Sequence, residues 1–333
     1  MNIYDISKKA GVSIATVSRV LNGSEKVSEA TRQKVLSVME ETGYRPNAFA
    51  RSLGLNSMFT VGIMCADSSD IHLAKAVYYL ERELRNNDYA SMLCCTGYNL
   101  EDKKKYLQLL LGRNVDAILF VGSNFIEDSE EGNDYLFETA KKMPVFLLNG
   151  HLAGENIYSV LCDDYQATFD LTDEILKSGA KKPVYLYRSL SYSGRRKLTG
   201  FQDACRKQGF SQTEEQCFAG PSSLEDTVSF VQELLEGDPA IDAVLASDDE
   251  LAAGAVKYAL TNHVEMPGQL QVAGYNNSLL STCSTPEITT VDSKLEFMCI
   301  TAVSLLMQTL QGKQAPQKTM FSGQIIHRGT TRR

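Results

Sequence analysis

The sequence predicts an α-helical N-terminal domain followed by a larger α/β core of two similar lobes. Three observations support this fold class. The chain has 333 residues, about twice the usual size of one domain. Short apolar runs alternate with helical patterns beyond about residue 59. Finally, the first sixty residues hold eight basic and five acidic side chains, whereas the rest hold 25 basic and 36 acidic ones, so a basic segment precedes an acidic body.

The overall composition is that of a folded globular protein. Hydrophobic residues make up 43% of the chain and charged residues 22%, which excludes a disordered, collagen-like or coiled-coil protein. No window approaches 18 consecutive apolar residues, and the opening residues 1–5 lack the features of a secretory signal. We therefore expect a cytoplasmic protein with no membrane partner.

Cysteine and histidine usage gives little support for a metal site. The eight cysteines show no C-x-x-C spacing, and none of the four histidines lies within helical spacing of another. Most cysteines lie in apolar runs such as 92–95, which is typical of buried free thiols in a reducing compartment. We expect neither a metal nor a cofactor.

Two short helices joined by a tight turn are predicted at the N-terminus. Ile3, Ile6 and Ala10 share one helical face, and Gly11 can end that helix with a positive φ. Ser13 is a good N-cap for a second helix, whose apolar stripe consists of Val17, Val20 and Leu21. This layout is that of a helix-turn-helix, whose second helix enters the DNA major groove.

Two further helices are predicted after the turn. One begins after Ser28 and ends before Gly43, with Val35, Val38 and Met39 on its apolar face. The other covers about seven residues after Asn47 and stops at Gly54. A helix this short is marginal in water, so it should be ordered only by a partner.

Residues 11–23 (GVSIATVSRVLNG) and 44–53 (YRPNAFARSL) resemble the recognition and hinge segments of the LacI/GalR family, the lactose-repressor/galactose-repressor family of bacterial transcription factors. The resemblance implies a homodimeric, sequence-specific regulator that binds double-stranded operator DNA, in most cases a repressor of carbohydrate-utilisation genes. A helical core unit that does not touch DNA is the alternative interpretation of the first pattern alone. The hinge-like segment 44–53 follows the recognition-like segment 11–23 at the spacing found in the family, which favours the family over that alternative.

The resemblance also implies which side chains contact DNA. Ile14 and Ala15 match base-reading positions, and their apolar side chains can touch thymine methyl groups but cannot hydrogen-bond. Leu53 matches a leucine that wedges into a minor-groove step and kinks the duplex. The complete implied set is Tyr4, Ser13, Ile14, Ala15, Thr16, Ser18, Arg19, Asn22, Asn47, Ala50, Arg51 and Leu53.

The rest of the chain resembles the family's effector-binding core, which is similar to periplasmic sugar-binding proteins. We expect a helix-turn-helix domain at 1–46, a hinge helix and linker at 47–58, and a two-lobed periplasmic-binding-protein-like core at 59–333. The N-lobe should cover about 59–160 and 294–321, and the C-lobe about 162–290 and 323–333. The chain should cross between them near Leu161, Val291 and Ser322, and a closing strand is expected at 324–331. No leucine-heptad helix follows, so a dimer is expected rather than a tetramer.

Polar residues at predicted strand ends are candidates for a ligand site in the cleft between the lobes. Carboxylates, amides and cationic groups suit a ligand with many hydroxyls. Solvated loop charges are the alternative interpretation of each residue taken singly. The strand-end candidates are Asp67, Ser69, Asp70, Asn149, Asp248, Asp249 and Asn276, and the family's effector-contacting segment adds Arg195 and Lys197.

Two positions depart from the family pattern, which usually has Arg at 197 and Asp at 276. Lys197 offers a single ammonium group where arginine would offer a planar guanidinium. Asn276 offers one acceptor and one donor group where aspartate would offer two acceptor oxygens. The effector should therefore differ from that of the best-known members. Arg195 and Lys197 beside a neutral Asn276 would tolerate an anionic group, so both a sugar and a sugar phosphate are candidates.

Two other functional classes fit the sequence less well. A sugar-binding protein without DNA function would lack the unit formed by residues 4–22. An enzyme would be expected to show a nucleophile, dinucleotide or phosphate-loop motif, and we find none. Within the family, both release of DNA by a sugar and corepression by a ligand or protein remain open; sugar-responsive members mostly act by release.

Overall fold

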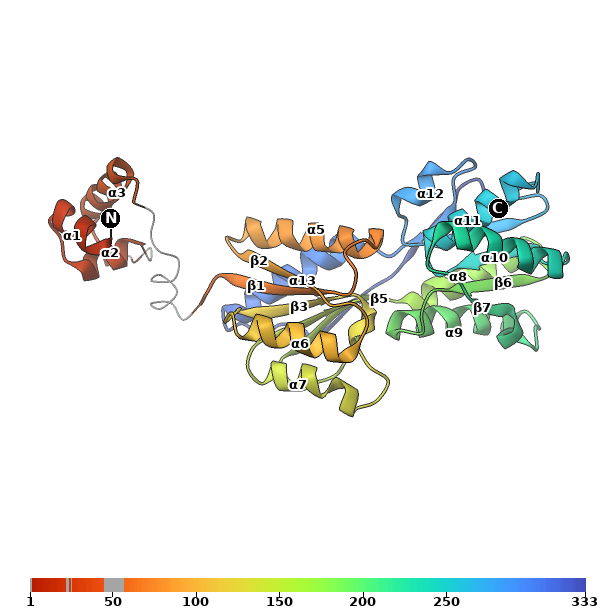
Figure 1. Cartoon of the computed structure of the whole chain (residues 1–333), viewed down its shortest axis with the longest axis horizontal. Coiled ribbons are helices and arrows are strands. Elements are labelled where there is room, and N and C mark those ends of the chain that lie inside the picture. Colours follow the sequence, from red (N-terminus) through yellow and green to blue (C-terminus); the bar gives the residue numbers. More distant parts are fainter. Residues whose placement is uncertain (1, 22–23, 25, 45–56) are drawn as a thin grey trace. The chain divides into compact units, whose positions relative to one another are not determined.

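The computed structural model describes residues 2–21, 24, 26–44 and 57–333. The chain divides into two compact units, one formed by residues 1–60 with 114–116 and the other by 61–113 with 117–333 (Figure 1). The predicted hinge helix, with Asn47, Ala50, Arg51 and Leu53, lies outside the described residues. The predicted DNA contact Asn22 lies outside them too.

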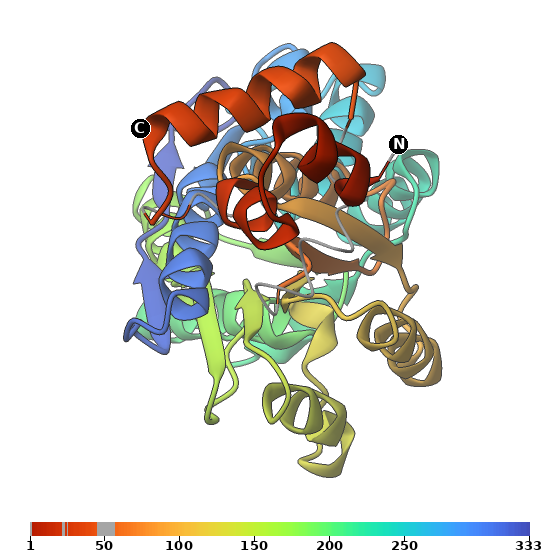
Figure 2. The ribbon, with the colours of Figure 1, turned by 90° about the vertical axis from the view of Figure 1, so that its left-hand side faces the viewer.

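The N-terminal unit contains three helices, α1 (Ile3–Ala10), α2 (Ile14–Leu21) and α3 (Glu29–Thr42). Asn2 caps α1, and Gly11 ends it at φ 60°, a conformation that favours glycine. Ser28 caps α3, which lies across α1 and α2 (Figure 2). Their facing apolar side chains form a small core of Ile6, Ala10, Val17, Val20, Val35 and Met39.

The first lobe of the core is built on a six-stranded sheet in the order β11-β5-β4-β3-β1-β2. Helices cover both of its faces, with α5 and α13 on one and α6 and α7 on the other (Figure 1). The elements are β1 (Thr60–Cys65), α5 (Ile71–Asn86), β2 (Ala90–Cys95), α6 (Leu100–Leu111), β3 (Ala117–Val121), α7 (Asp134–Ala140), β4 (Val145–Leu148), β5 (Ile157–Cys162), α13 (Leu295–Leu310) and β11 (Lys318–Phe321).

The second lobe repeats this plan with the sheet order β12-β10-β9-β8-β6-β7. Helices α8 and α9 pack on one face, whereas α10 and α11 pack on the other. The elements are α8 (Asp164–Lys177), β6 (Pro183–Tyr187), α9 (Tyr192–Lys207), β7 (Cys217–Ala219), α10 (Leu224–Gly237), β8 (Ala243–Ala246), α11 (Asp249–Thr261), β9 (Gln271–Tyr275), α12 (Leu279–Cys283), β10 (Thr289–Asp292) and β12 (Gln324–Ile326).

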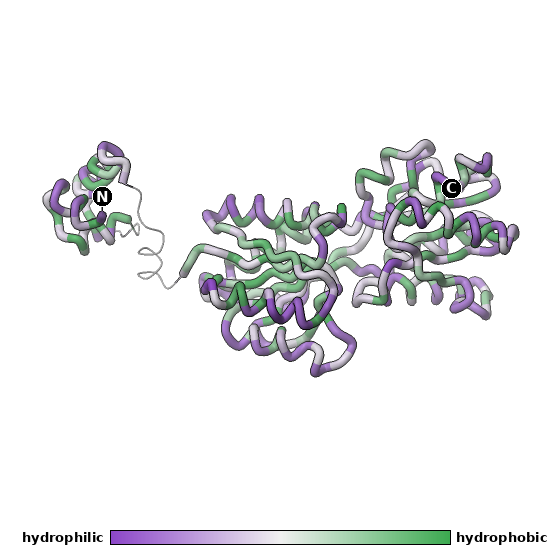
Figure 3. The backbone as a smooth tube through the Cα atoms, viewed as in Figure 1, coloured by the Kyte–Doolittle hydropathy of each residue, from purple (hydrophilic) through white to green (hydrophobic). Residues whose placement is uncertain are grey.

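The chain passes between the two sheets three times, after β5, after β10 and between β11 and β12. Apart from the antiparallel β12, every strand pair with a defined register is parallel. All residues of β3, β4, β8 and β9 are buried, as a parallel sheet covered on both faces requires. Hydrophobic residues accordingly follow the strands in Figure 3.

Two expectations need correction. The predicted closing strand at 324–331 is only three residues long, because β12 pairs with β10 from Gln324 to Ile326 alone. The cysteines are free, as expected, but Cys95 and Cys283 are exposed rather than buried. Within the described ranges, no helix has the length and apolar character needed to span a bilayer.

Candidate functional site

The strand order fixes where a ligand site is expected in each lobe. In each sheet the chain adds strands first toward one edge and then toward the other. This change of direction falls between β1 and β3 in the first lobe and between β6 and β8 in the second. Ligands of open α/β sheets bind outside the carboxyl ends of strands at such switch points. The segments that follow these strands are 66–70, 122–124, 188–193 and 247–248.

These segments line a cavity of about 370 Å³ between the lobes, which we call the inner cavity. The first lobe contributes Asp70 and His72 from the N-terminus of α5, and Asn149 from the end of β4. The second lobe contributes Lys197 and Asp248. The remaining lining residues are Leu73, Tyr98, Gly122, Ser123, Asn124, Arg188, Ser189, Ser191, Ser193, Gly194, Ser222, Ser247 and Asn276.

A second cavity of about 290 Å³, the outer cavity, adjoins the first and shares seven of its residues. Residues found only in the outer cavity are Asp67, Ser69, Ile71, Asp249, Glu250, Ser278 and Leu280. Five carboxylates therefore line the two cavities, against the two cations Arg188 and Lys197. The cleft is acidic.

Both cations are bonded to protein groups. The Arg188 guanidinium bonds Asp248 through Nε at 3.3 Å, Glu250 through Nη2 at 3.0 Å and the Pro221 carbonyl through Nη1 at 2.6 Å. The Lys197 ammonium is buried, donates to the Ser247 carbonyl at 2.9 Å and lies 3.8 Å from the centre of the Tyr275 ring.

Lys197 also stabilises a buried carboxylate. Asp164 accepts hydrogen bonds from Ser193 Oγ at 2.6 Å and from Tyr275 Oη at 2.7 Å. Burial raises the pKa of Asp164 above its usual value, whereas the positive charge of Lys197 acts to lower it. Lys197, which we expected to bind the effector, therefore has a role in the core of the second lobe.

His72 is neutral at physiological pH. Burial and the nearby charge of Lys197 lower the pKa of its imidazole to about 4. It therefore offers one donor and one acceptor to the inner cavity rather than a positive charge.

The cleft brings together most of the predicted effector residues. Asp70, Asn149, Lys197, Asp248 and Asn276 line the inner cavity. Asp67, Ser69 and Asp249 line the outer one, but the Asp249 carboxylate is bonded to Ser278 N and Thr290 Oγ1, both at 2.5 Å. Arg195 lies in neither cavity. Its guanidinium bonds the Leu190 carbonyl and pairs with Asp128.

Two of the amide residues also have a backbone role. Asn149 and Asn276 have φ values of 66° and 96°, where asparagine is tolerated better than most residues. The side-chain oxygen of Asn149 is nevertheless buried without a hydrogen-bond partner among the described residues. This oxygen is enclosed by protein, so Asn149 borders the inner cavity through other atoms.

The sequence-based selection missed several lining residues. Arg188 follows β6 directly, so the strand-end argument that identified Asp248 could have identified it too. His72 lies one residue inside α5, and Tyr98 lies three residues beyond β2, so neither gave a clear signal.

Contacts between the lobes gather beside the inner cavity at the start of α9. Ser123 Oγ donates to Ser191 Oγ at 2.8 Å, and Asn149 Nδ2 lies 3.5 Å from Ser193 Oγ. The Arg195–Asp128 ion pair is a third link between the lobes.

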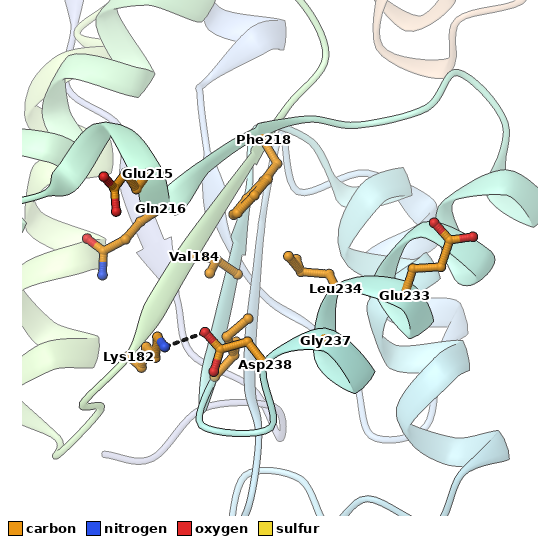
Figure 4. Close-up of a pocket in the computed structure, with 10 residues that line it drawn as sticks. Lys182, Val184, Glu215, Gln216, Phe218, Glu233, Leu234, Gly237 and Asp238 are labelled. Carbon is orange, nitrogen blue, oxygen red and sulfur yellow. Dashed lines mark ion pairs between the residues drawn. The ribbon is translucent and has the colours of Figure 1, made fainter.

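The second lobe has a further cavity of about 250 Å³ at the amino ends of its strands (Figure 4). Val184, Phe218 and Leu234 point into it, and the Lys182–Asp238 ion pair lies at its edge. Because this apolar space lies between α10 and the sheet, away from the carboxyl ends of the strands, we assign the ligand site to the interlobe cleft.

The helix-turn-helix unit exposes the predicted DNA-reading residues that the structure describes. Ile14, Ala15 and Arg19 are exposed on α2, whereas Val17 and Val20 are buried. Thr16 and Ser18 are half-buried, and Tyr4 on α1 is 67% exposed. Ser13 caps α2 by accepting from Thr16 N at 3.1 Å.

The chain was compared with known proteins. A model of "Bacterial regulatory proteins, lacI family" matches residues 2–47, and one of "Periplasmic binding proteins and sugar binding domain of LacI family" matches residues 59–326. An HTH-type transcriptional regulator of Lachnoclostridium phytofermentans is 49% identical over 331 residues, 99% of each chain.

Catabolite control protein A of Priestia megaterium is 32% identical and covers 92% of this chain and 91% of its own. The structure of the lac repressor dimer bound to operator and the anti-inducer ONPF has the same fold, with a TM-score of 0.88, 22% identity and 99% coverage of both chains. The chain therefore belongs to the lacI family of bacterial regulatory proteins, and it is a DNA-binding transcriptional regulator rather than an enzyme.

Proposed function

We propose that this protein is a cytoplasmic, homodimeric repressor of carbohydrate-utilisation genes, and that a neutral sugar bound in the interlobe cleft releases it from its operator. The observation that carries the sugar proposal is the Asp70 carboxylate, which is exposed in the inner cavity and caps α5 through one of its two oxygens. A sugar hydroxyl can donate to it. The homodimer is proposed by analogy with the lac repressor dimer.

The charges of the cleft favour a neutral sugar over a sugar phosphate. Asp70 caps α5 through one oxygen and keeps acceptor capacity for hydroxyls, whereas Asp248 caps α11 through Oδ1 and accepts from Arg188 Nε through Oδ2. Arg188 and Lys197 are bonded to protein groups, and a phosphate would lie near several carboxylates. Arg195, on which our expectation of an anionic ligand partly rested, pairs with Asp128 instead.

The DNA contacts are proposed on the family match and on exposure. Arg19 can donate two hydrogen bonds to a guanine edge or a phosphate, whereas Ile14 and Ala15 can touch thymine methyl groups. Tyr4, Ser13, Thr16 and Ser18 are proposed to contact the backbone or neighbouring bases. Asn22, Asn47, Ala50, Arg51 and Leu53 complete the proposed interface outside the described residues.

The proposal is tested on the full-length protein with an operator selected from random duplexes. Calorimetry and operator titrations are run with glucose, galactose, mannose and xylose, with their common disaccharides, and with glucose 6-phosphate. We expect one or more neutral sugars to bind and to weaken operator affinity by about 5- to 150-fold, a usual strength of coupling between two sites. Asp70→Asn, which can still cap α5 but lacks the carboxylate, should weaken the binding of the active sugar.

The alternatives predict different results. A sugar that strengthens operator binding would show corepression in place of release. Binding of glucose 6-phosphate in preference to glucose would overturn the assignment of a neutral ligand. If no carbohydrate binds or changes operator affinity, the sugar-responsive function is wrong and a protein corepressor becomes the better explanation.

A further inference from the structure

The chain enters the core through residues 57–60, which lead into β1, and one carboxylate holds this segment. Asp116, which precedes β3, accepts from Met58 N through Oδ1 at 3.0 Å and from Thr60 N through Oδ2 at 2.9 Å. The backbone N–H of Asp116 also donates to the Thr60 carbonyl at 2.8 Å. Three hydrogen bonds from one residue therefore fix the entry segment, although it lies 56 to 58 positions earlier in the sequence.

The backbone of residues 57–60 has a conformation that needs such support. Phe59 has a φ of 50°, in the left-handed region that bulky side chains rarely adopt. Its N–H donates to Ser57 Oγ at 3.1 Å, and the Thr60 hydroxyl donates to the Met58 carbonyl at 3.1 Å. A strained backbone of this kind persists only where the surrounding contacts hold it. The Asp116 carboxylate holds the residues on both sides of Phe59.

The second lobe has the same arrangement at the equivalent position. Asp242 precedes β8 as Asp116 precedes β3, and the two aspartates lie in the similar sequences IDAVL and VDAIL. The Asp242 carboxylate accepts from Lys181 N and Lys182 N, both at 2.8 Å, and both aspartates are half-buried. The segments that they hold differ in what they connect. Lys181 and Lys182 join two elements of the core, whereas residues 57–60 join the core to the part of the chain that carries the DNA-reading helix.

We propose that Asp116 is a positioning residue for operator binding, because it fixes the point at which the chain leaves the core toward the DNA-reading helix. A dimer must present its two reading helices at a fixed spacing to bind both half-sites of an operator. If residues 57–60 are released, their backbone has to be ordered when DNA binds, and this ordering costs affinity. The role of Asp116 concerns operator binding alone, so it holds with or without a sugar in the cleft.

The test compares full-length Asp116→Ala with full-length Asp242→Ala on the selected operator, by fluorescence anisotropy at fixed salt. Asp242→Ala is the matched control, because it removes the same charge and the same kind of hydrogen bonds from a segment inside the core. We expect Asp116→Ala to bind operator about 5- to 30-fold more weakly than the parent, the cost of ordering the backbone of one residue. Asp242→Ala should change the affinity less than about twofold. Loss of a negative charge would by itself favour DNA binding, so a weaker complex is not an electrostatic effect.

Proteolysis measures the release of the segment directly. Chymotrypsin cleaves after aromatic residues, and the hydrogen bonds around Phe59 should protect the parent chain there. Asp116→Ala should be cut after Phe59 several times faster than the parent, and Asp242→Ala at the parent's rate, as followed by mass spectrometry.

Thermal unfolding checks that each variant is folded at the assay temperature. If an alanine variant does not fold, Asp116→Asn and Asp242→Asn decide the matter, because asparagine keeps one acceptor oxygen and only the first should weaken operator binding. Unchanged operator affinity in Asp116→Ala, equal losses in the two matched variants, or unchanged cleavage after Phe59 would each overturn the proposal. None of these results would alter the proposed response to a sugar.

Discussion

At the residue scale, the position of a charged side chain along a helix decides whether it faces the cleft. Ser193 and Lys197 are four residues apart on α9 and both line the inner cavity. Arg195 is two residues from each, about 200° around the helix, so it cannot share their face. The family resemblance identified the segment but not this difference. Helical periodicity would have separated Lys197 from Arg195 once α9 was known to begin at Tyr192.

Lys197→Met should destabilise the second lobe as well as disturb ligand binding. The substitution leaves the Asp164 carboxylate buried without the charge that lowers its pKa. We expect a loss of roughly 3 kcal/mol in the free energy of unfolding, typical of breaking a buried charge interaction. Urea titration of the full-length variant at pH 7 measures it.

The pH dependence of that loss has a definite sign. Because the folded-state pKa of Asp164 lies above its unfolded value of 3.8, ionising it costs stability as the pH rises from 3.8 to the folded pKa. Without Lys197 the folded pKa rises further, so the loss should continue to higher pH than in the parent. Lys197→Met/Asp164→Asn should recover much of the stability. A single variant as stable as the parent at pH 7 would show that the charge interaction contributes little.

At the element scale, amphipathic periodicity reveals helices that have one face in water and the other in the core. The residues Leu73, Ala76, Leu80 and Leu84 form the buried stripe of α5, and a prediction based on spacing locates such a helix well. Helix α13 (Leu295–Leu310) gives no such signal, because apolar residues lie on most of its sides. The signal for α10 was present, since Ser223 caps it and Asp226 follows three residues later.

Helix α2 should carry operator recognition through its exposed face. Arg19→Ala removes a side chain that is exposed and lies outside the buried core of the unit, so folding should be unaffected. We expect operator affinity to fall by about 1 to 3 kcal/mol, the worth of a good contact to a base edge. Fluorescence anisotropy with the selected operator, at fixed salt, measures the change.

Lys34→Ala on α3 is the matched control, because Lys34 is also exposed and basic but lies outside α2. It removes the same charge and should reduce affinity less than Arg19→Ala. Equal losses on operator and on random DNA in the two variants would indicate a general electrostatic effect, and would argue against base recognition by Arg19.

At the scale of the whole core, the cleft could be predicted only in outline. Strand-end reasoning placed Asp70, Asn149, Asp248 and Asn276 at one site because parallel strands bring their carboxyl ends to one edge of each sheet. It could not show which side chains are already hydrogen-bonded to other protein groups, as Asp249 is to Thr290 and Arg188 is to Pro221. It also gave no sign of the links between lobes, since these depend on how the two sheets face each other.

Those links predict how a ligand acts on the core. A ligand alters DNA affinity only through its different affinities for two arrangements of the protein, so the lobes must be free to change arrangement for the effector to work.

Ser123 Oγ and Ser191 Oγ are 2.8 Å apart across the cleft, so Ser123→Cys/Ser191→Cys brings two thiols close enough to form a disulfide with a small adjustment. The oxidised variant should bind operator with nearly the same affinity with and without the active sugar, whereas the reduced variant should keep the parent's response. The parent chain under the same oxidation serves as control for the exposed Cys95 and Cys283. An oxidised variant that still responds fully would mean that this edge of the cleft does not move, and that the signal passes through the opposite edge, near Asp67 and Asp249.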